Sequence, residues 1–184
     1  MNLLHLSKYT EIFKKELANL PLDFISEQPR PQGEWIGSQY IDEIIAKYAD
    51  GKYGWLKGGQ DHVEDTWISW PIIWDSQAVP GNCALCPMSS TILLNIEKYN
   101  IKVAGFALMK GGVKLKEHTD HVTDGYLFTY HLGIKCPDKC NLHIESGPIE
   151  EVDGKQVVFN AKNTHWAENG SEEDRVILYI EVYS

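Results

Sequence analysis

The residues best suited to chemistry are histidines and one nearby carboxylate in the second half of the chain. Five of the seven histidines lie between positions 118 and 165. His118 and Asp120 are two residues apart, and on an extended strand this spacing points both side chains toward one ion. His165 follows later, after a short apolar run. Two imidazoles and one carboxylate form the facial triad of non-haem iron oxygenases, which leaves coordination positions open for a co-substrate and O2.

Arg175 adds a second feature to this possible iron site. It is one of two arginines in the chain and begins the apolar stretch RVILYIEVY. A guanidinium beside such a strand is costly to bury unless an anion pairs with it, and its planar fork suits a carboxylate. We therefore interpret Arg175 as an anchor for the dicarboxylate 2-oxoglutarate. Taken alone, it is more typical of an ion pair with Glu172, Glu173 or Asp174.

The four cysteines allow two interpretations. Cys83 and Cys86 form a CxxC pair, and Cys136 and Cys140 form a CxxxC pair. Four thiolates could bind zinc, in which case the chain could be a non-catalytic binding module. The other interpretation is four small, buried thiols.

Composition argues against several classes of partner. The chain has 17 Lys and Arg against 26 Asp and Glu, a net charge of −9. Bulk nucleic-acid binding needs a basic face, so we expect no nucleic-acid partner. No apolar run is long enough to span a membrane, and the first twenty residues lack a secretory-signal pattern. We therefore expect a cytoplasmic protein with no membrane partner and reduced cysteines.

The two halves of the chain differ in their hydrophobic periodicity. Residues 1–100 are mixed and partly helical, whereas residues 101–184 have the two-residue period of strands. In the first half we expect a helix capped by Ser7 and ended by Pro21, a loop over Pro21–Gly37, a helix from Ser38 to Asp50-Gly51, a strand over Thr66–Trp74 and a helix beginning at Pro87. We expect Pro71 to place a bulge or an edge in that strand.

The second half predicts a compact antiparallel β region within a single domain of residues 1–184. The expected strands are Ile101–Met109, Val113–Glu117, Tyr126–Ile134, Asn141–Glu145, Val157–Phe159 and Val176–Tyr183. Asp153-Gly154 is the strongest hairpin signal. Many short strands at this spacing favour a sandwich or barrel, so the fold class is mostly β with N-terminal helices.

Several motifs of this region, in this order, resemble the aspartyl/asparaginyl β-hydroxylase family of Fe(II)/2-oxoglutarate-dependent dioxygenases. The resemblance covers roughly residues 67–183. It is carried by HTD at 118–120, YHLGI at 130–134, DGKQVVFN at 153–160, HWAEN at 165–169 and RVILYIEV at 175–182.

The resemblance implies both a fold and a set of ligands. The implied core is a double-stranded β-helix, also called a jelly roll and similar to cupins, spanning residues 101–184. His118, Asp120 and His165 correspond to the iron ligands, and Arg175 corresponds to the residue on the distal carboxylate of 2-oxoglutarate. His131, in the HLG position, is implied to help hold this co-substrate.

The sequence departs from the family pattern at three positions. Asp120 stands where the animal enzymes have Gly, which restores the full triad. Thr129 stands where Arg is common, and Ala107 stands where a Ser contacts the co-substrate. We therefore expect rearranged co-substrate contacts, made through Tyr126 or Tyr130.

The predicted activity is hydroxylation of an unactivated C–H bond, using Fe(II), 2-oxoglutarate and O2. The resemblance suggests an Asp or Asn residue of a peptide or protein as substrate, with a free amino acid such as proline as the alternative. A cupin-like metalloenzyme that does not use 2-oxoglutarate is a further alternative. In the substrate pocket, His121 is a candidate for a hydrogen bond to the substrate, and Trp166 is a candidate for the pocket wall or for packing under the barrel rim.

Overall fold

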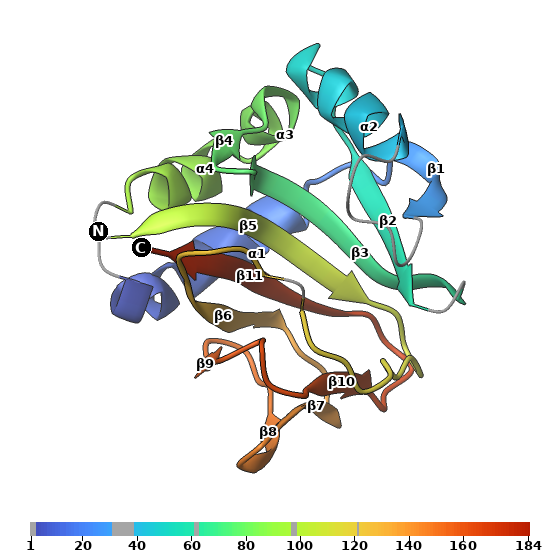
Figure 1. The fold of residues 1–184 in the computed structure, drawn as a ribbon, viewed down its shortest axis with the longest axis vertical. Coiled ribbons are helices and arrows are strands. Elements are labelled where there is room, and N and C mark those ends of the chain that lie inside the picture. Colours follow the sequence, from blue (N-terminus) through green and yellow to red (C-terminus); the bar gives the residue numbers. More distant parts are fainter. Residues whose placement is uncertain (1–2, 31–38, 61–62, 97–98, 121) are drawn as a thin grey trace.

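Two β-sheets form the body of the molecule in a computed structural model that describes residues 3–30, 39–60, 63–96, 99–120 and 122–184 (Figure 1). The large sheet has the strand order β1-β2-β3-β5-β11-β6-β9, with β4 paired to β3, and the small sheet has the order β10-β7-β8. The strands are β1 (Phe24–Arg30), β2 (Trp55–Gln60), β3 (Val63–Trp74), β4 (Gln77–Ala78), β5 (Asn100–Met109), β6 (Tyr126–Lys135), β7 (Cys140–Ile144), β8 (Gly147–Glu150), β9 (Gln156–Phe159), β10 (Trp166–Asn169) and β11 (Arg175–Tyr183).

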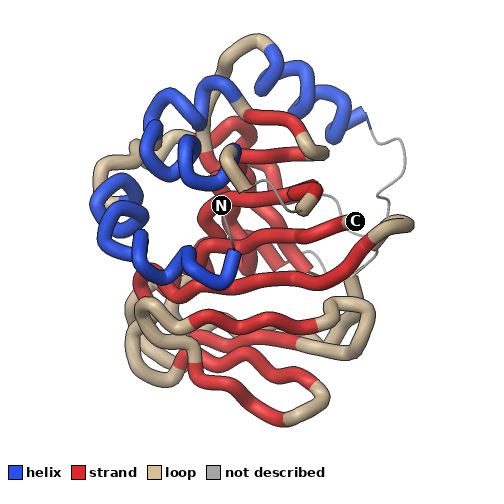
Figure 2. The backbone as a smooth tube through the Cα atoms, turned by 90° about the vertical axis from the view of Figure 1, so that its left-hand side faces the viewer, coloured by secondary structure: helices blue, strands red, loops and turns tan. Residues whose placement is uncertain are grey.

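Strand β11 lies inside the large sheet and is buried on both faces over most of its length, which explains the apolar run at residues 176–180. Alternate residues of β11, such as Leu178 and Ile180, join a core cluster with Phe13 and Leu93 of the helices. Figure 2 shows these helices gathered on one face of the sheet. On the opposite face, buried residues of both sheets form a second cluster that contains Met109, Phe159, Tyr183, Leu142 and Ala167.

The helices are η1 (Leu3–Tyr9, a 3-10 helix), α1 (Thr10–Leu17), α2 (Gln39–Ala49), α3 (Pro80–Leu85) and α4 (Pro87–Leu94). The helices predicted before Asp50-Gly51 and from Pro87 are confirmed, although Ser38 lies outside the described residues. The predicted Ser7 cap is wrong, because helical structure already begins at Leu3; the Ser7 carbonyl instead accepts a hydrogen bond from Thr10 Oγ1 at 2.7 Å. Within the described ranges, no helix is long and apolar enough to cross a membrane.

The region predicted as a loop over Pro21–Gly37 contains strand β1, so this prediction is wrong for Phe24–Arg30. β1 pairs in parallel with β2, a strand that the sequence pattern also did not indicate. Such pairing comes from long-range contacts, which override weak local preferences. Pro71 is not at an edge but coincides with a register shift between β3 and β5, as a bulge would require.

Two further expectations in the second half are corrected. Val113–Glu117 does not form a strand; Lys114 makes an isolated bridge to Glu168. Asp153-Gly154 does not close a hairpin, because β8 belongs to the small sheet and β9 pairs with β6 in the large one. Gly154, with φ +77°, instead turns the chain from one sheet to the other.

Asn82 of α3 connects three parts of the chain: α3 itself, strand β3 and the segment just before β2. It is fully buried, its Nδ2 donates to the Pro71 carbonyl at 2.8 Å, and its Oδ1 accepts from the Gly54 N–H at 2.9 Å.

Asn82→Ala should lower the free energy of unfolding by about 2–3 kcal/mol, because both partners would remain buried and unpaired. Chemical denaturation measures this. Asn19→Ala, which loses an exposed bond to the Lys15 carbonyl, should change it by less than about 0.5 kcal/mol.

Candidate metal centre

The three predicted metal ligands come from two segments that lie side by side. His118 and Asp120 are on the connection between β5 and β6, and His165 directly precedes β10. His118 and His165 exchange two backbone hydrogen bonds with N···O distances of 3.0 and 2.9 Å, and the Asp120 N–H donates to the Ala161 carbonyl at 2.8 Å. This pairing brings together side chains that are distant in the sequence.

The three side chains converge with the geometry of a metal site. One possible ligand atom from each lies within 4.8 Å of the others, and Asp120 Oδ1 is 3.6 Å from His118 Nε2 and 3.8 Å from His165 Nε2. The Nδ1 atoms lie 2.8 and 2.9 Å from the carbonyls of Lys116 and Asn163. Because a carbonyl only accepts, each Nδ1 carries the proton and each Nε2 lone pair is free for a metal. This donor set fits Fe(II).

Burial also favours the neutral form of His165, which is the form needed in a metal ligand. Its imidazole is nearly covered, and the Phe159 ring packs against it with the ring centroids 5.1 Å apart. Burial lowers the pKa of His165 below its ordinary value, although the Asn163 carbonyl and Asp120 oppose this effect. A neutral imidazole is the form that binds a metal ion.

A buried ion pair joins Arg175 to Glu151, a residue that the sequence analysis missed. Arg175 is fully buried at the start of β11, and its Nη2 contacts Glu151 Oε2. The other oxygen, Glu151 Oε1, is 2.8 Å from His131 Nδ1. Two of the three acidic residues expected to pair with Arg175 have other partners: Asp174 pairs with Lys110 at 2.9 Å, and Glu173 pairs with Lys135 at 3.5 Å.

Gly133 explains how Glu151 reaches this position. It lies two residues after His131, on the same face of β6. A Cβ at Gly133 would collide with the Val152 carbonyl oxygen, so only glycine lets the chain after β8 cross here. That crossing places Glu151 beside His131. In the sequence, the only indication of a carboxylate partner was that a buried guanidinium needs an anion. Nothing in the sequence distinguished Glu151 from Glu150 as that partner.

The cluster of Arg175, Glu151 and His131 contains buried nitrogen atoms that have no hydrogen-bond partner. Burial opposes ionisation of Glu151, but the Arg175 charge and the His131 hydrogen bond lower its pKa to about 2. Burial lowers the pKa of His131, so its imidazole is neutral near pH 7. Arg175 Nε and Nη1 and His131 Nε2 are buried without a hydrogen-bond partner. The unpaired N–H groups of Arg175 are buried donors that fit a carboxylate-bearing ligand, whereas Nε2 of a neutral His131 is an acceptor.

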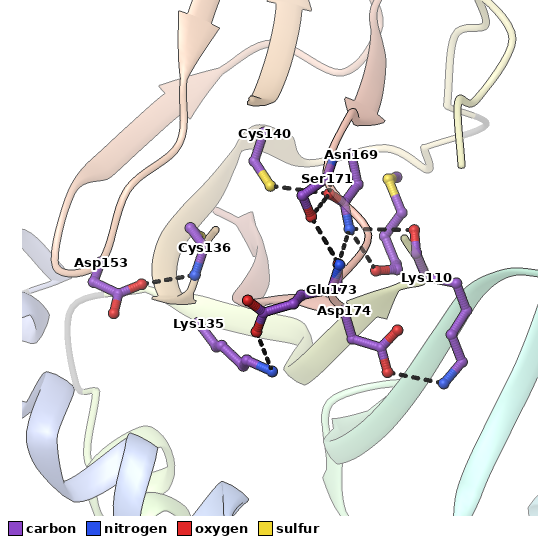
Figure 3. A network of polar contacts seen from close by, with 10 residues as sticks. Lys110, Lys135, Cys136, Cys140, Asp153, Asn169, Ser171, Glu173 and Asp174 are labelled. Atoms are coloured by element: carbon purple, nitrogen blue, oxygen red, sulfur yellow. Dashed lines mark hydrogen bonds and ion pairs between the residues drawn. The ribbon is translucent and has the colours of Figure 1, made fainter. Parts of the chain in front are cut away.

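Asn169 holds the turn that leads into Arg175 (Figure 3). Its Nδ2 donates to the carbonyls of Met109, Lys110 and Glu173 at 3.2, 3.2 and 2.7 Å. Its Oδ1 accepts from the backbone N–H of Ser171 at 3.1 Å and from the Ser171 hydroxyl at 2.7 Å. The first residue of β11 is thereby held in place at the end of the barrel.

Comparison with known proteins decides the family. The profile of the aspartyl/asparaginyl beta-hydroxylase family matches residues 41–184, more than three quarters of the chain. The chain belongs to this family. As a member of the aspartyl/asparaginyl β-hydroxylase family it is a 2-oxoglutarate-dependent dioxygenase that uses Fe(II) and O2, and the His/Asp/His triad fits iron binding. No curated protein sequence matches it.

Solved structures show the fold. A 2OG-Fe(II) oxygenase family oxidoreductase from Burkholderia pseudomallei is 14% identical, with 78% of each chain covered and a TM-score of 0.53. The viral collagen prolyl hydroxylase of Paramecium Bursaria Chlorella virus-1 is 16% identical, with 63% of this chain and 78% of that chain covered and a TM-score of 0.42. The predicted mostly β fold with a cupin-like jelly roll is confirmed.

Tyr130 does not lie with the other predicted residues of this β-hydroxylase site. It follows Thr129 and precedes His131 on β6, so its side chain points to the helix-covered face, where it is fully buried in the core. Its hydroxyl donates to Gln156 Oε1 at 2.7 Å. Tyr130 therefore does not face the metal centre, and the expected contact between Tyr130 and the co-substrate is wrong. Tyr126 does lie on the face of the small sheet, with its hydroxyl 3.0 Å from Thr129 Oγ1.

Tyr130→Phe tests this correction. The variant should bind 2-oxoglutarate with unchanged affinity and should lose about 1 kcal/mol of stability, because only the bond to Gln156 disappears. Equilibrium binding and thermal denaturation measure the two quantities. A Kd raised tenfold or more would return Tyr130 to the site.

Trp166 also points away from the metal centre. It directly follows His165 on an extended segment, so the two side chains lie on opposite faces of the small sheet. On the outer face Trp166 stacks on His143, with centroids 3.4 Å apart and an angle of 7°, and Lys114 Nζ lies 4.0 Å from the Trp166 ring centroid. It lines an open groove of about 320 Å³ with Lys114, Leu115, Lys116 and Glu117. Trp166 is therefore not a wall beside the triad, and His121 lies outside the described residues.

The four cysteines do not form a zinc site. Cys83 and Cys86 donate to the carbonyls of Ile72 and Asn82, whereas Cys140 donates to Asn169 Oδ1 at the other end of the molecule. Burial raises the pKa of the Cys86, Cys136 and Cys140 thiols to about 11, 12 and 11, which disfavours thiolates. Among the described residues, His118, Asp120 and His165 are the group that could hold a metal. The zinc-module interpretation is wrong.

Proposed function

We propose that the protein hydroxylates an Asp or Asn residue of a peptide or protein at an Fe(II) ion held by His118, Asp120 and His165. In this proposal Arg175 would pair with the far carboxylate of an iron-bound 2-oxoglutarate, with His131 beside it. The observation that carries the proposal is the set of buried, unpartnered nitrogen atoms on Arg175 and His131, in the same barrel as a converged metal triad. Family membership supports the same assignment.

Each residue contributes a defined part. The Nδ1–H groups of His118 and His165 are held by backbone carbonyls, which keeps both Nε2 atoms aimed at the metal position. Asp120 supplies the anionic ligand. Arg175 Nε and Nη1 offer donors to a carboxylate, and Glu151 and the Asn169 turn hold the guanidinium in place. The iron, with 2-oxoglutarate and O2, supplies the oxidising power for C–H hydroxylation.

The decisive experiment is an anaerobic titration of the purified protein with Fe(II) and 2-oxoglutarate, monitored by visible absorption. Chelation of Fe(II) by 2-oxoglutarate should give a metal-to-ligand charge-transfer band, and Arg175→Met should remove it at the same co-substrate concentration. Iron binding without this band would favour a cupin-like enzyme that does not use 2-oxoglutarate.

The substrate class needs a separate assay. The Fe(II)-loaded protein is incubated with 2-oxoglutarate and either Asp- or Asn-containing peptides or free amino acids, and succinate formation is measured with the mass of each product. Addition of one oxygen atom to an Asp or Asn residue supports the proposal. Turnover of free proline, with none of any peptide, would replace it with an amino-acid hydroxylase.

A further inference from the structure

The charges in the barrel leave the proposed co-substrate pocket one negative charge in excess. Arg175 and Glu151 neutralise each other, and His131 donates its Nδ1–H to Glu151 and is otherwise neutral. With iron, Asp120 and a dianionic 2-oxoglutarate, the sum is +2 −1 −2 +1 −1, or −1. A pocket without Glu151 would be neutral. A net charge of −1 is costly in a buried site. Binding of the ligand therefore favours uptake of one proton by a group in the pocket.

We propose that Glu151 couples ligand binding in this pocket to protonation: by neutralising Arg175, it makes binding of the co-substrate depend on the transfer of one proton from solvent to His131 Nε2. This inference rests on the proposed function. The proton adds to the nitrogen that is buried without a partner, while the Nδ1–H remains donated to Glu151. The resulting N–H can donate to the incoming ligand, and the imidazolium supplies the missing positive charge.

The surroundings of His131 leave it as the group that can take this proton. Glu151 faces it from the chain after β8, Arg175 and Tyr179 from β11, and Phe159 from β9, with the Tyr179 and Phe159 centroids 5.5 and 5.0 Å away. Arg175 stays charged, and burial raises the pKa of Tyr179 well above its ordinary value. Asp120 and His165 act on His131 from farther away, and the Phe159 ring packs against both His131 and His165.

Calorimetric titration tests this with the full-length protein saturated with Mn(II) and the unreactive analogue N-oxalylglycine. Titration at one pH in two buffers of different ionisation enthalpy gives the number of protons taken up. We expect a value close to one near pH 7.5 and a Kd that rises about tenfold per pH unit above neutrality. Glu151→Gln should reduce the uptake to near zero and flatten this pH dependence. Glu150→Gln, the same change at an exposed neighbouring position, should behave like the wild type.

The outcomes separate this inference from the proposed function. Binding of N-oxalylglycine by the wild type without proton uptake overturns the role of Glu151 and leaves the proposed function intact. No binding at any pH overturns both. If Glu151→Gln does not fold, Glu151→Asp and His131→Gln replace it, with uptake retained in the first and lost in the second. Uptake that persists in His131→Gln would contradict the assignment to His131.

Discussion

Replacing His165 with alanine should lower 2-oxoglutarate turnover more than about a hundredfold. Loss of a residue that only orients a metal ligand already costs about 10- to 100-fold in metal affinity or activity, and His165 is itself a proposed ligand. Its Nε2 lies 3.8 Å from Asp120 Oδ1, and no other described side chain joins this group. Iron stoichiometry after desalting and succinate formation measure the loss.

His143→Ala is the matched control for this variant. His143 lies on the outer face of the small sheet, stacked on Trp166 and 3.2 Å from Glu168 Oε1. It should keep the iron stoichiometry and the turnover of the wild type within about twofold, since surface changes away from a site have small effects. Full iron content and full turnover in His165→Ala would refute the proposed metal centre.

Replacing Glu151 with alanine should lower the free energy of unfolding by about 3–5 kcal/mol. Removing one partner of a buried ion pair leaves the other charge uncompensated, and here Arg175 is fully buried. His131 Nδ1 would lose its acceptor in the same step. Urea denaturation at neutral pH measures the change. Glu150→Ala, at an exposed neighbour, should change the stability by less than about 0.5 kcal/mol.

The same carboxylate makes stability depend on acid pH. The pKa of Glu151 is lowered from 4.5 to about 2 in the folded protein, since Arg175 and His131 stabilise the ionised form more than burial penalises it. A lowered pKa contributes stability above the unfolded value, and this contribution, about 3 kcal/mol, is lost as the pH falls from about 4.5 toward 2. Glu151→Ala should therefore show a weaker loss of stability over this range. An unchanged slope would contradict the ion pair.

Part of the site could be predicted because it depends on residue type and local geometry. His118 and Asp120 share one side of an extended segment, and their donor types with His165 indicate a metal whatever the rest of the fold. The same alternation excludes two of the predictions: Tyr130 adjoins His131, and Trp166 adjoins His165, so neither pair can share one face of an extended segment. These corrections follow from strand geometry and needed no tertiary structure.

Other features depend on contacts between distant segments. Nothing local distinguishes Glu151 from Glu150; Glu151 reaches Arg175 and His131 only because the chain after β8 crosses Gly133. Asp153-Gly154 has the composition of a hairpin turn, yet its flanking strands join different sheets.

By itself, the sequence determined the β-rich second half, the triad and the need of Arg175 for an anion, because periodicity and donor chemistry are properties of short segments. Only the tertiary structure decided which carboxylate pairs with Arg175 and which strands become neighbours. The physical reason is that both are set by the burial of groups far apart along the chain, where the cost of an unpaired charge or backbone group selects the partner.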